Sequence, residues 1–280
     1  MNAFFHLTKS YLIETLRSPT ALFWSLAFPL VFVVGFPYLF SGGQSERIAY
    51  IIPGVLTINL IAASFFGISL NMVTQREKGL FRQFRVTPLK KHTIISANAA
   101  HAFIVTTLSL IVQLVVAMLL FGIRIHGSWT GLILACLFGM WAFIPLGLWV
   151  GSTARDTKTA PAITNLLFFP FMFLSGAAFP LFLMPAFFQK LAYWIPATYV
   201  LELIQGAMVR TFSIRDSLGA IGILVATGAI AFILNALFFR WESQQKINLK
   251  HLVLALLALI LLYGGAFLLK PQLYSLVQPG

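Results

Sequence analysis

Seven long apolar stretches divide this sequence, and its basic residues collect in alternate gaps between them. Each stretch is close to or above the roughly 18 residues that a helix needs to cross a bilayer. The chain is 59% hydrophobic and 9% charged, whereas soluble domains carry about 25% charged residues. The pattern predicts an all-α polytopic membrane protein with spans at residues 20–40, 50–73, 94–122, 131–152, 161–183, 218–239 and 252–269.

The basic gaps also predict an orientation, because Lys and Arg are retained on the cytoplasmic side of a membrane. The gap at residues 75–92 carries six basic residues against one acid, Glu77. With the N-terminus in the cytoplasm, thirteen of the 19 Lys and Arg residues lie inside and six lie outside. We therefore expect a cytoplasmic N-terminus, and a C-terminus outside if the seventh stretch crosses. The competing arrangement for that stretch is a helix that lies flat or turns back.

Residues 184–209 break the regular pattern. They are apolar, but they contain Pro185, Pro196, Lys190 and Glu202. Proline in a helix interior removes a hydrogen bond, so one straight span is disfavoured. Two short helices that dip into the membrane and return fit better, since re-entrant segments are tolerated where protein covers them. Glu202 either gates or braces this outer hairpin, or it is a solvated charge.

The two ends of the chain need separate interpretations. Residues 1–19 mix aromatic, apolar and charged side chains, as in a helix that lies in the membrane interface or in a simple lead-in helix to the first span. The first span is too long for a signal-peptide core and lacks a cleavage site, so we expect it to be retained. Residues 241–280 are predicted to form a cytoplasmic linker and an extra span.

Catalytic motifs are absent from the sequence. It has no G-x-x-x-x-G-K-[ST], H-E-x-x-H or G-x-S-x-G motif, its five histidines are scattered singly, and Cys136 has no partner. We expect no catalytic residue, no metal site and no cofactor in this chain. The net charge of +12 lies in loops rather than on one folded face, which argues against nucleic acid as a partner. None of the seven acids falls in a predicted crossing helix, so proton coupling lacks its usual carboxylate. A transporter of this composition needs an external motor.

Three segments of the sequence resemble the permease subunit of type-2 ABC exporters. The first is R-S-P-T-A-L-F-W at residues 17–24, followed by F-P at residues 28–29. The second is Q-R-E-K-G-L-F-R-Q-F-R-V-T-P at residues 75–88, which is similar to the family's coupling helix. The third runs from L-S-G at residues 174–176 through F-P, M-P and Y-W-I-P to Gly206. The resemblance covers about residues 1–240.

The resemblance implies a fold, a partner and a location. The fold is a six-span transmembrane domain at residues 20–240 with a re-entrant outer hairpin, to which the seventh span is an addition. The partner is a separate ABC ATPase subunit that binds ATP and Mg²⁺. A homodimer of permeases, or a heterodimer, would sit in membrane lipid in a bacterial inner membrane. The loop is more basic than the family pattern, because Arg82 replaces the usual Glu, so the expected partner surface is acidic.

The residues at 75–88 also predict a short amphipathic helix on their own. Apolar side chains fall on one of its sides, and Pro88 should stop it. Such a helix docks into a groove on a soluble partner or lies on anionic lipid, and the resemblance favours docking. The predicted ATPase-coupling residues are Arg76, Glu77, Lys78, Leu80, Phe81 and Phe84.

The resemblance places the substrate path along the second and fifth spans at a dimer interface. An aromatic and methionine-rich wall with a few amides suits amphiphilic molecules of varied shape, although these side chains also suit ordinary helix packing. The expected path residues are Asn59, Phe66, Asn165, Phe169, Met172 and Phe173. The expected function is ATP-driven export of hydrophobic or amphipathic compounds. The alternatives are export of a lipid-linked glycan and a membrane assembly role without transport.

Overall fold

The computed structural model describes residues 2–40, 42, 45–86, 89–209, 214–238 and 249–269, and every regular element in these ranges is a helix. The elements in chain order are α1 (Asn2–Arg17), α2 (Pro19–Leu22), η1 (Phe23–Ala27), α3 (Phe28–Phe40), α4 (Ser45–Ala62), η2 (Ala63–Ile68), α5 (Ser69–Glu77), α6 (Leu80–Arg85), α7 (Lys91–Phe121), α8 (Trp129–Thr153), α9 (Ala160–Leu174), η3 (Leu181–Leu183), α10 (Ala186–Ala192), α11 (Pro196–Val209), α12 (Ile214–Phe238) and α13 (Leu249–Leu269).

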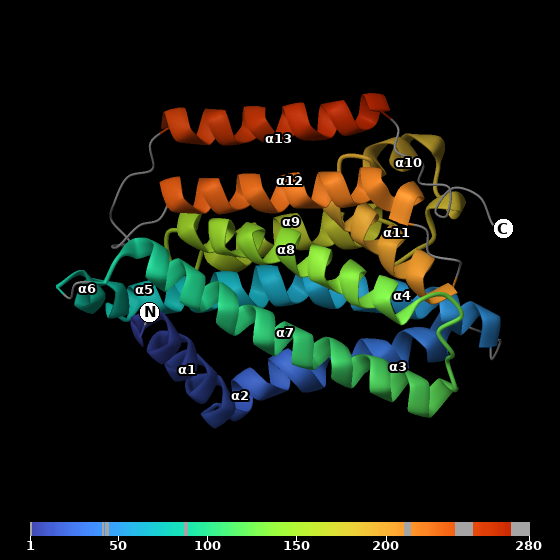
Figure 1. The fold of residues 1–280 in the computed structure, drawn as a ribbon, viewed down its shortest axis with the longest axis horizontal. Helices are drawn as coiled ribbons and strands as arrows, with labels where there is room; N and C mark the ends of the chain where they lie inside the picture. The colour runs from blue at the N-terminus through green and yellow to red at the C-terminus, as the bar shows by residue number, and fades with distance from the viewer. Residues whose placement is uncertain are drawn as a thin grey trace.

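The long helices run side by side along the longest axis of the molecule (Figure 1). One end of the bundle holds α6 and the end of α5, and the opposite end holds the α10–α11 hairpin. Glu77 at the end of α5 contacts Thr157, so the α8–α9 turn lies at the α6 end. The basic gaps around Arg82 and Lys158 therefore share one end of the bundle, as expected for loops on one side of a membrane.

Most predicted spans agree with the observed helices. Four helices in the described residues are long and apolar enough to cross a membrane: 48–77, 91–121, 129–153 and 217–238. The first of these is one continuous rod made of α4, η2 and α5. The first predicted span is likewise assembled from α2, the π-helical turn η1 and α3.

The fifth predicted span was too long. It was expected to run over residues 161–183, but α9 ends at Leu174. Gly176 follows with a φ of 90°, a left-handed conformation that ends the helix. A 15-residue helix is about 22 Å long, which is shorter than a hydrocarbon core of about 30 Å. The chain therefore turns before the outer face and enters the short 3₁₀ helix η3.

Helix α8 forms the centre of the bundle, where it packs along α12, α11 and η2. Its close approach to η2 depends on Gly147, because a Cβ at this position would collide with the backbone carbonyl of Ser64. One turn later a Cβ on Gly151 would lie 2.9 Å from the carbonyl oxygen of Ser69. Small residues four apart let helix backbones meet in membranes. This crossing holds the second span against the fourth.

The outer segment forms two short helices, as predicted. Helices α10 and α11 are separated by a turn that ends at Pro196, the first residue of α11. Thr198 donates a hydrogen bond to the Ala192 carbonyl at 2.8 Å, and Tyr199 donates one to the Tyr193 carbonyl at 2.7 Å. Helix α11 is mostly buried against α8 and α4. Protein therefore covers α11, whereas most of α10 is exposed, and the re-entrant path through the membrane stays a prediction.

Helix α13 runs beside α12 for most of its length (Figure 1). The ring of Phe267, near the end of α13, lies 6.2 Å from the Tyr193 ring and 6.4 Å from the Trp194 ring of the outer hairpin. The end of α13 is therefore beside the hairpin, opposite α6. The predicted linker at residues 241–248 and the predicted tail after residue 269 lie outside the described residues.

Helix α1 lies at an angle to the bundle and packs on the α6 end of α7. The Thr15 hydroxyl lies 2.8 Å from Nε2 of His101, and the Tyr11 ring packs edge-on against the same imidazole. Burial raises the pKa of Tyr11 to about 12. His101 thus helps to hold α1 against α7.

Candidate functional site

The predicted coupling helix is shorter than expected. It was placed at residues 75–88, but Gln75 to Glu77 complete α5, and α6 covers Leu80–Arg85. The turn between them contains Gly79, whose φ is 74°. Val86 follows the helix as a turn residue, and the predicted stop at Pro88 lies outside the described residues. Helix α6 projects from the end of the bundle (Figure 1).

The apolar side of α6 faces the protein's own core. Phe81 is fully buried, and Leu80 and Phe84 are half-buried. Phe81 therefore cannot form the docking surface that the sequence predicted. The exposed side chains at this end are Glu77, Lys78, Arg82 and Gln83, together with Val86, which is 87% exposed. Sequence reasoning missed Gln83 and Val86, because a helix only six residues long gives little periodic signal.

Arg76 also turns inward. Its side chain is 3% exposed, and its guanidinium donates hydrogen bonds to the carbonyls of Gly151 at 3.1 Å, Ser152 at 3.5 Å and Ala154. These carbonyls belong to the end of α8, where backbone acceptors have no partner within the helix. A cation at a helix C-terminus is also favoured by the helix dipole. Arg76 therefore ties the end of α5 to the end of α8.

Glu77, the next residue, attaches the end of α5 to the α8–α9 turn. Its carboxylate accepts hydrogen bonds from the Thr157 backbone N–H at 3.1 Å and from the Thr157 hydroxyl at 2.7 Å. Asp156 orders the same turn, because its Oδ1 accepts from the backbone N–H groups of Lys158 at 3.2 Å and Thr159 at 2.7 Å. The Thr159 N–H is the largest cause of a lowered pKa at Asp156. We name the end of α5 and α6, residues 75–86, the coupling region after its predicted role. The α8–α9 turn is an ordered element attached to it.

Asn59, a predicted path residue, lies inside the protein. It is 4% exposed, and its amide nitrogen donates to the Ser109 hydroxyl at 3.1 Å and to the Gln113 side-chain oxygen at 2.8 Å. Gln113 in turn donates to the Pro29 carbonyl at 3.0 Å. This polar cluster joins α4, α7 and α3 within the bundle. Asn59 therefore does not face an open path.

Helix α9 carries an exposed aromatic face. Asn165, Phe169 and Phe173 are exposed, with Phe169 48% and Phe173 38% accessible. Met172, which was expected on the same face, turns inward and is 8% exposed. Phe66 is half-buried, and its ring lies 5.0 Å from the Phe168 ring at the edge of this face. Three of the six predicted path residues, Asn165, Phe169 and Phe173, are thus exposed on α9.

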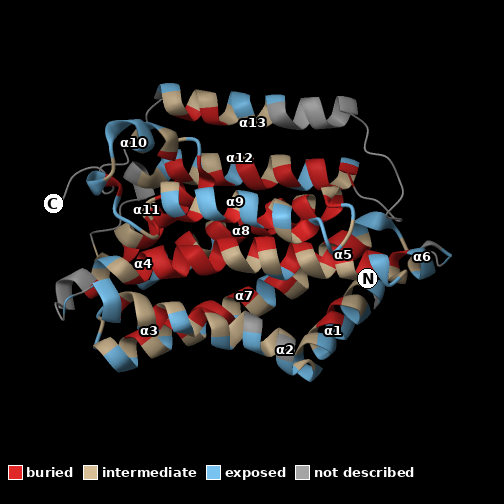
Figure 2. Cartoon of the chain, turned by 180° about the vertical axis from the view of Figure 1, so that it is seen from behind, coloured by how far each residue is buried: buried red, intermediate tan, exposed pale blue. Residues whose placement is uncertain are grey.

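The exposed face of α9 continues onto α3 through stacked rings. We name Phe40, Phe169, Phe173 and Phe179 the aromatic strip. Phe169 stacks on Phe173 at 6.3 Å, Phe173 stacks on Phe179 at 5.9 Å, and Phe40 meets Phe179 edge-on at 6.0 Å. All four are at least 38% exposed. Figure 2 shows exposed positions along α9 and α3 on either side of the mostly buried α4.

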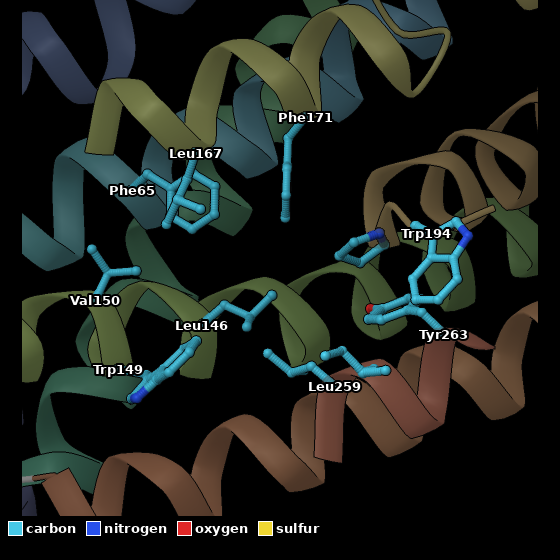
Figure 3. Close-up of a pocket in the computed structure, with 11 residues that line it drawn as sticks. Phe65, Leu146, Trp149, Val150, Leu167, Phe171, Trp194, Leu259 and Tyr263 are labelled. Carbon is cyan, nitrogen blue, oxygen red and sulfur yellow. The ribbon is translucent and has the colours of Figure 1, made fainter. Parts of the chain in front are cut away.

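A separate apolar cavity of about 220 Å³ lies between α8, α9 and α13 (Figure 3). Its lining includes Trp149, Leu167, Phe171, Leu259 and Tyr263. None of the predicted path residues lines it. Helix α13 packs along α12 but not along α8 and α9, and the cavity is the space that remains between these helices.

The outer hairpin positions the last predicted residues. Pro185 precedes α10 and is exposed, whereas Pro196 begins α11 and is buried. Glu202 is half-buried on α11. Among the described residues no group of three or more His, Cys, Asp and Glu side chains comes together to hold a metal ion.

The matches to known proteins cover most of this arrangement. Residues 2–209 match the model of the family described as "ABC-2 type transporter". The chain belongs to this family. The matched residues contain the coupling region, α9 and the outer hairpin, while α12 and α13 lie beyond them.

Curated relatives of this ABC-2 permease are transport proteins. "Putative transport permease YvfS" of Bacillus subtilis is 25% identical over 69% of this chain and 82% of its own length. "Daunorubicin resistance ABC transporter permease protein DrrB1" of Streptomyces coeruleorubidus is 28% identical over 64% of this chain and 62% of its own length. "Probable multidrug ABC transporter permease YbhS" of Escherichia coli is 22% identical over 68% of this chain, which spans about half of that relative. This ABC-2 permease is a multi-pass membrane subunit of a transport system.

Proposed function

We propose that this permease is the membrane-spanning part of an ATP-driven exporter that moves hydrophobic or amphipathic compounds out of a bacterial cell. The observation that carries the proposal is the aromatic strip, which leaves four phenylalanine rings accessible on a single connected face. Ring faces and edges contact apolar molecules of many shapes without demanding fixed hydrogen bonds. Names of two relatives, for multidrug and daunorubicin resistance, point to the same class of compound.

In the proposed exporter, the aromatic strip lines a substrate path between two copies of the chain. An apolar face opening into a substrate path needs a second wall, and a symmetric dimer supplies the same face again. Helix α9 provides Asn165 as an amide beside Phe169. A large glycan would need many polar partners along such a wall, so the strip favours amphipathic compounds over a lipid-linked glycan. The outer hairpin with Glu202 would close the path at the end opposite α6.

The motor is a separate ABC ATPase subunit that binds ATP and Mg²⁺ and docks at the α6 end. The exposed side chains there include Lys78 and Arg82, so a complementary partner surface is acidic. We expect the purified permease alone to hydrolyse no ATP, with the N-terminus and α6 on the cytoplasmic side of the inner membrane.

The test uses the permease reconstituted with its ATPase in proteoliposomes. The probes are an anthracycline and a hydrophobic cationic dye, and ATP-dependent transport is measured for Phe169→Ala and Phe173→Ala. Leu119→Ala is the control, because Leu119 is 78% exposed and lies on α7, which carries no residue of the strip. We expect the phenylalanine variants to change the apparent KM for the probes and their relative rates. Wild-type kinetics in both strip variants would contradict the proposed path.

A cross-linking experiment tests the dimer directly. In a Cys136→Ser background, Phe173→Cys should form an oxidised dimer in native membranes, whereas Leu119→Cys should remain monomeric. Cross-linking through Leu119→Cys alone would place the interface on α7 and remove the path from α9.

A further inference from the structure

Two consecutive residues at the end of α5 bind the end of α8 and the turn that follows it. Arg76 holds the last carbonyls of α8, and Glu77 holds Thr157 in the turn that leads into α9. Each residue is about 80 positions away in sequence from its partner. The end of α5, the end of α8 and the turn before α9 are therefore joined immediately before the chain turns at Gly79 into α6.

The Arg76 and Glu77 contacts differ in burial. The Arg76 side chain is buried. Loss of its guanidinium would remove a hydrogen-bond donor from three buried carbonyls, so Arg76 contributes to folding stability. The Glu77–Thr157 contact is exposed to water. An exposed contact of this kind contributes little to folding stability. Stability therefore does not explain why Glu77 accepts two hydrogen bonds from Thr157.

The position of Thr157 in the chain points to a role in transmitting movement to α9. Thr157 stands three residues before α9, and Asp156 and Thr159 order the intervening turn. Helix α9 then carries Phe169 and Phe173 of the aromatic strip. The Glu77–Thr157 contact thus gives a polar route from α6 and the end of α5 to α9, beside the apolar packing of Val73 on Ala160 at the start of α9.

We propose that Thr157 is a positioning residue that passes movement of the coupling region to α9 by holding the Glu77 carboxylate. This inference rests on the proposed function, because it presumes an ATPase that moves α6 and a substrate path along α9. Thr157 acts through Glu77 and touches neither nucleotide nor substrate. The route runs through α9 itself, so it couples ATP hydrolysis to the wall that contacts the substrate.

The experiment compares transport per ATP hydrolysed in proteoliposomes that contain the full permease and its ATPase. Thr157→Val removes the hydroxyl donor and keeps the shape of the side chain. Thr157→Ser restores the donor, and Thr130→Val is a control at an exposed threonine on the opposite end of α8. We expect Thr157→Val to lower transport per ATP by about fivefold, a typical size for coupling between two sites. Thr157→Ser should recover most of the loss, and Thr130→Val should behave as wild type.

A double-mutant comparison separates this role from direct docking of Glu77. If Glu77 acts through Thr157, Glu77→Ala combined with Thr157→Val lowers transport per ATP no further than Glu77→Ala alone. Co-purification of the ATPase and the melting temperature should stay at the wild-type level in Thr157→Val. Independent, multiplying losses in the double variant, or full coupling in Thr157→Val, would overturn the inference and leave the export function in place. A wild-type complex that transports neither probe would overturn both.

Discussion

The hydroxyl of Tyr263 on α13 lies 2.7 Å from the hydroxyl of Thr227 on α12. Thr227 also donates to the Ile223 carbonyl at 2.7 Å, so its single proton is used and it accepts from Tyr263. Both side chains are buried. A helix beyond the residues matched by the family model is therefore fixed to the bundle by a specific polar contact as well as by apolar packing.

Replacement of Tyr263 by Phe should loosen α13 by a small amount. The change removes one buried hydrogen bond and keeps the ring, and such bonds in membrane proteins contribute about 0.6 kcal/mol on average. Tyr263→Ala removes the ring as well and should cost about 3–5 kcal/mol. Thermal unfolding in detergent measures both, with Leu261→Ala as the control because Leu261 is 75% exposed. Equal melting temperatures for Tyr263→Ala and the control would show that α13 is not docked.

The two asparagines predicted for the path should behave in opposite ways. Asn59→Leu removes a buried donor from Ser109 and Gln113, and we expect it to lower stability by about 1–3 kcal/mol. Asn165→Leu changes an exposed residue and should leave the melting temperature close to wild type while it alters transport of amphipathic probes. Melting temperature and transport kinetics are measured on both variants. A destabilised Asn165→Leu with a stable Asn59→Leu would reverse this assignment.

These asparagines show what the sequence could and could not predict. The apolar stretches predicted α7, α8 and α12 to within a few residues, since length and hydropathy decide a membrane helix. The rotation of each helix depends on its neighbours, which no single stretch encodes. Helical spacing grouped Met172 with Phe169 and Phe173, yet only the packing of α9 on the bundle decides that Met172 turns inward.

The coupling region shows the same limit. The charges around α6 predicted a loop outside the hydrocarbon, and α6 lies at one end of the bundle. The sequence could not reveal that Arg76 is buried, since its acceptors are the carbonyls of a helix about 75 residues away. Phe81 was expected to dock a partner because it is apolar, and it is instead the side chain that anchors α6 to its own protein.

Glycine substitutions should separate a close helix crossing from an open helix surface. Gly147→Ala places a Cβ against the Ser64 carbonyl, so it should force α8 away from η2 and lower stability by about 1–3 kcal/mol. Gly222→Ala meets no atom within 4 Å on α12, and removing glycine from a helix favours folding by up to about 1 kcal/mol. Thermal unfolding in detergent compares the two. Equal stabilities would mean that the crossing relaxes freely.

The exposed end of α6 should determine ATPase binding. Val86 is 87% exposed and lies next to the basic side chains of α6, so Val86→Asp places a negative charge where an acidic partner is expected. We predict that less ATPase co-purifies with this variant and that the loss is greater at low salt than at high salt, because like-charge repulsion is screened. Thr130→Asp, which adds the same charge at an exposed position at the opposite end of α8, is the control. ATPase recovery that is unaffected by Val86→Asp would place the docking surface elsewhere.

The direction of α13 predicts the location of the C-terminus. Helix α12 ends and α13 begins at the α6 end, and α13 runs back along α12 and brings Phe267 to the outer hairpin. If α6 faces the cytoplasm, residue 269 lies at the outer face. An alkaline phosphatase fused after Gly280 should then be active, and a green fluorescent protein at the same point should be dark. Fusions after Arg85 supply the opposite reference, since the α6 end should give fluorescence and no phosphatase activity. A fluorescent protein that is bright after Gly280 would show that α13 does not cross, and it would leave the coupling region and the aromatic strip as described.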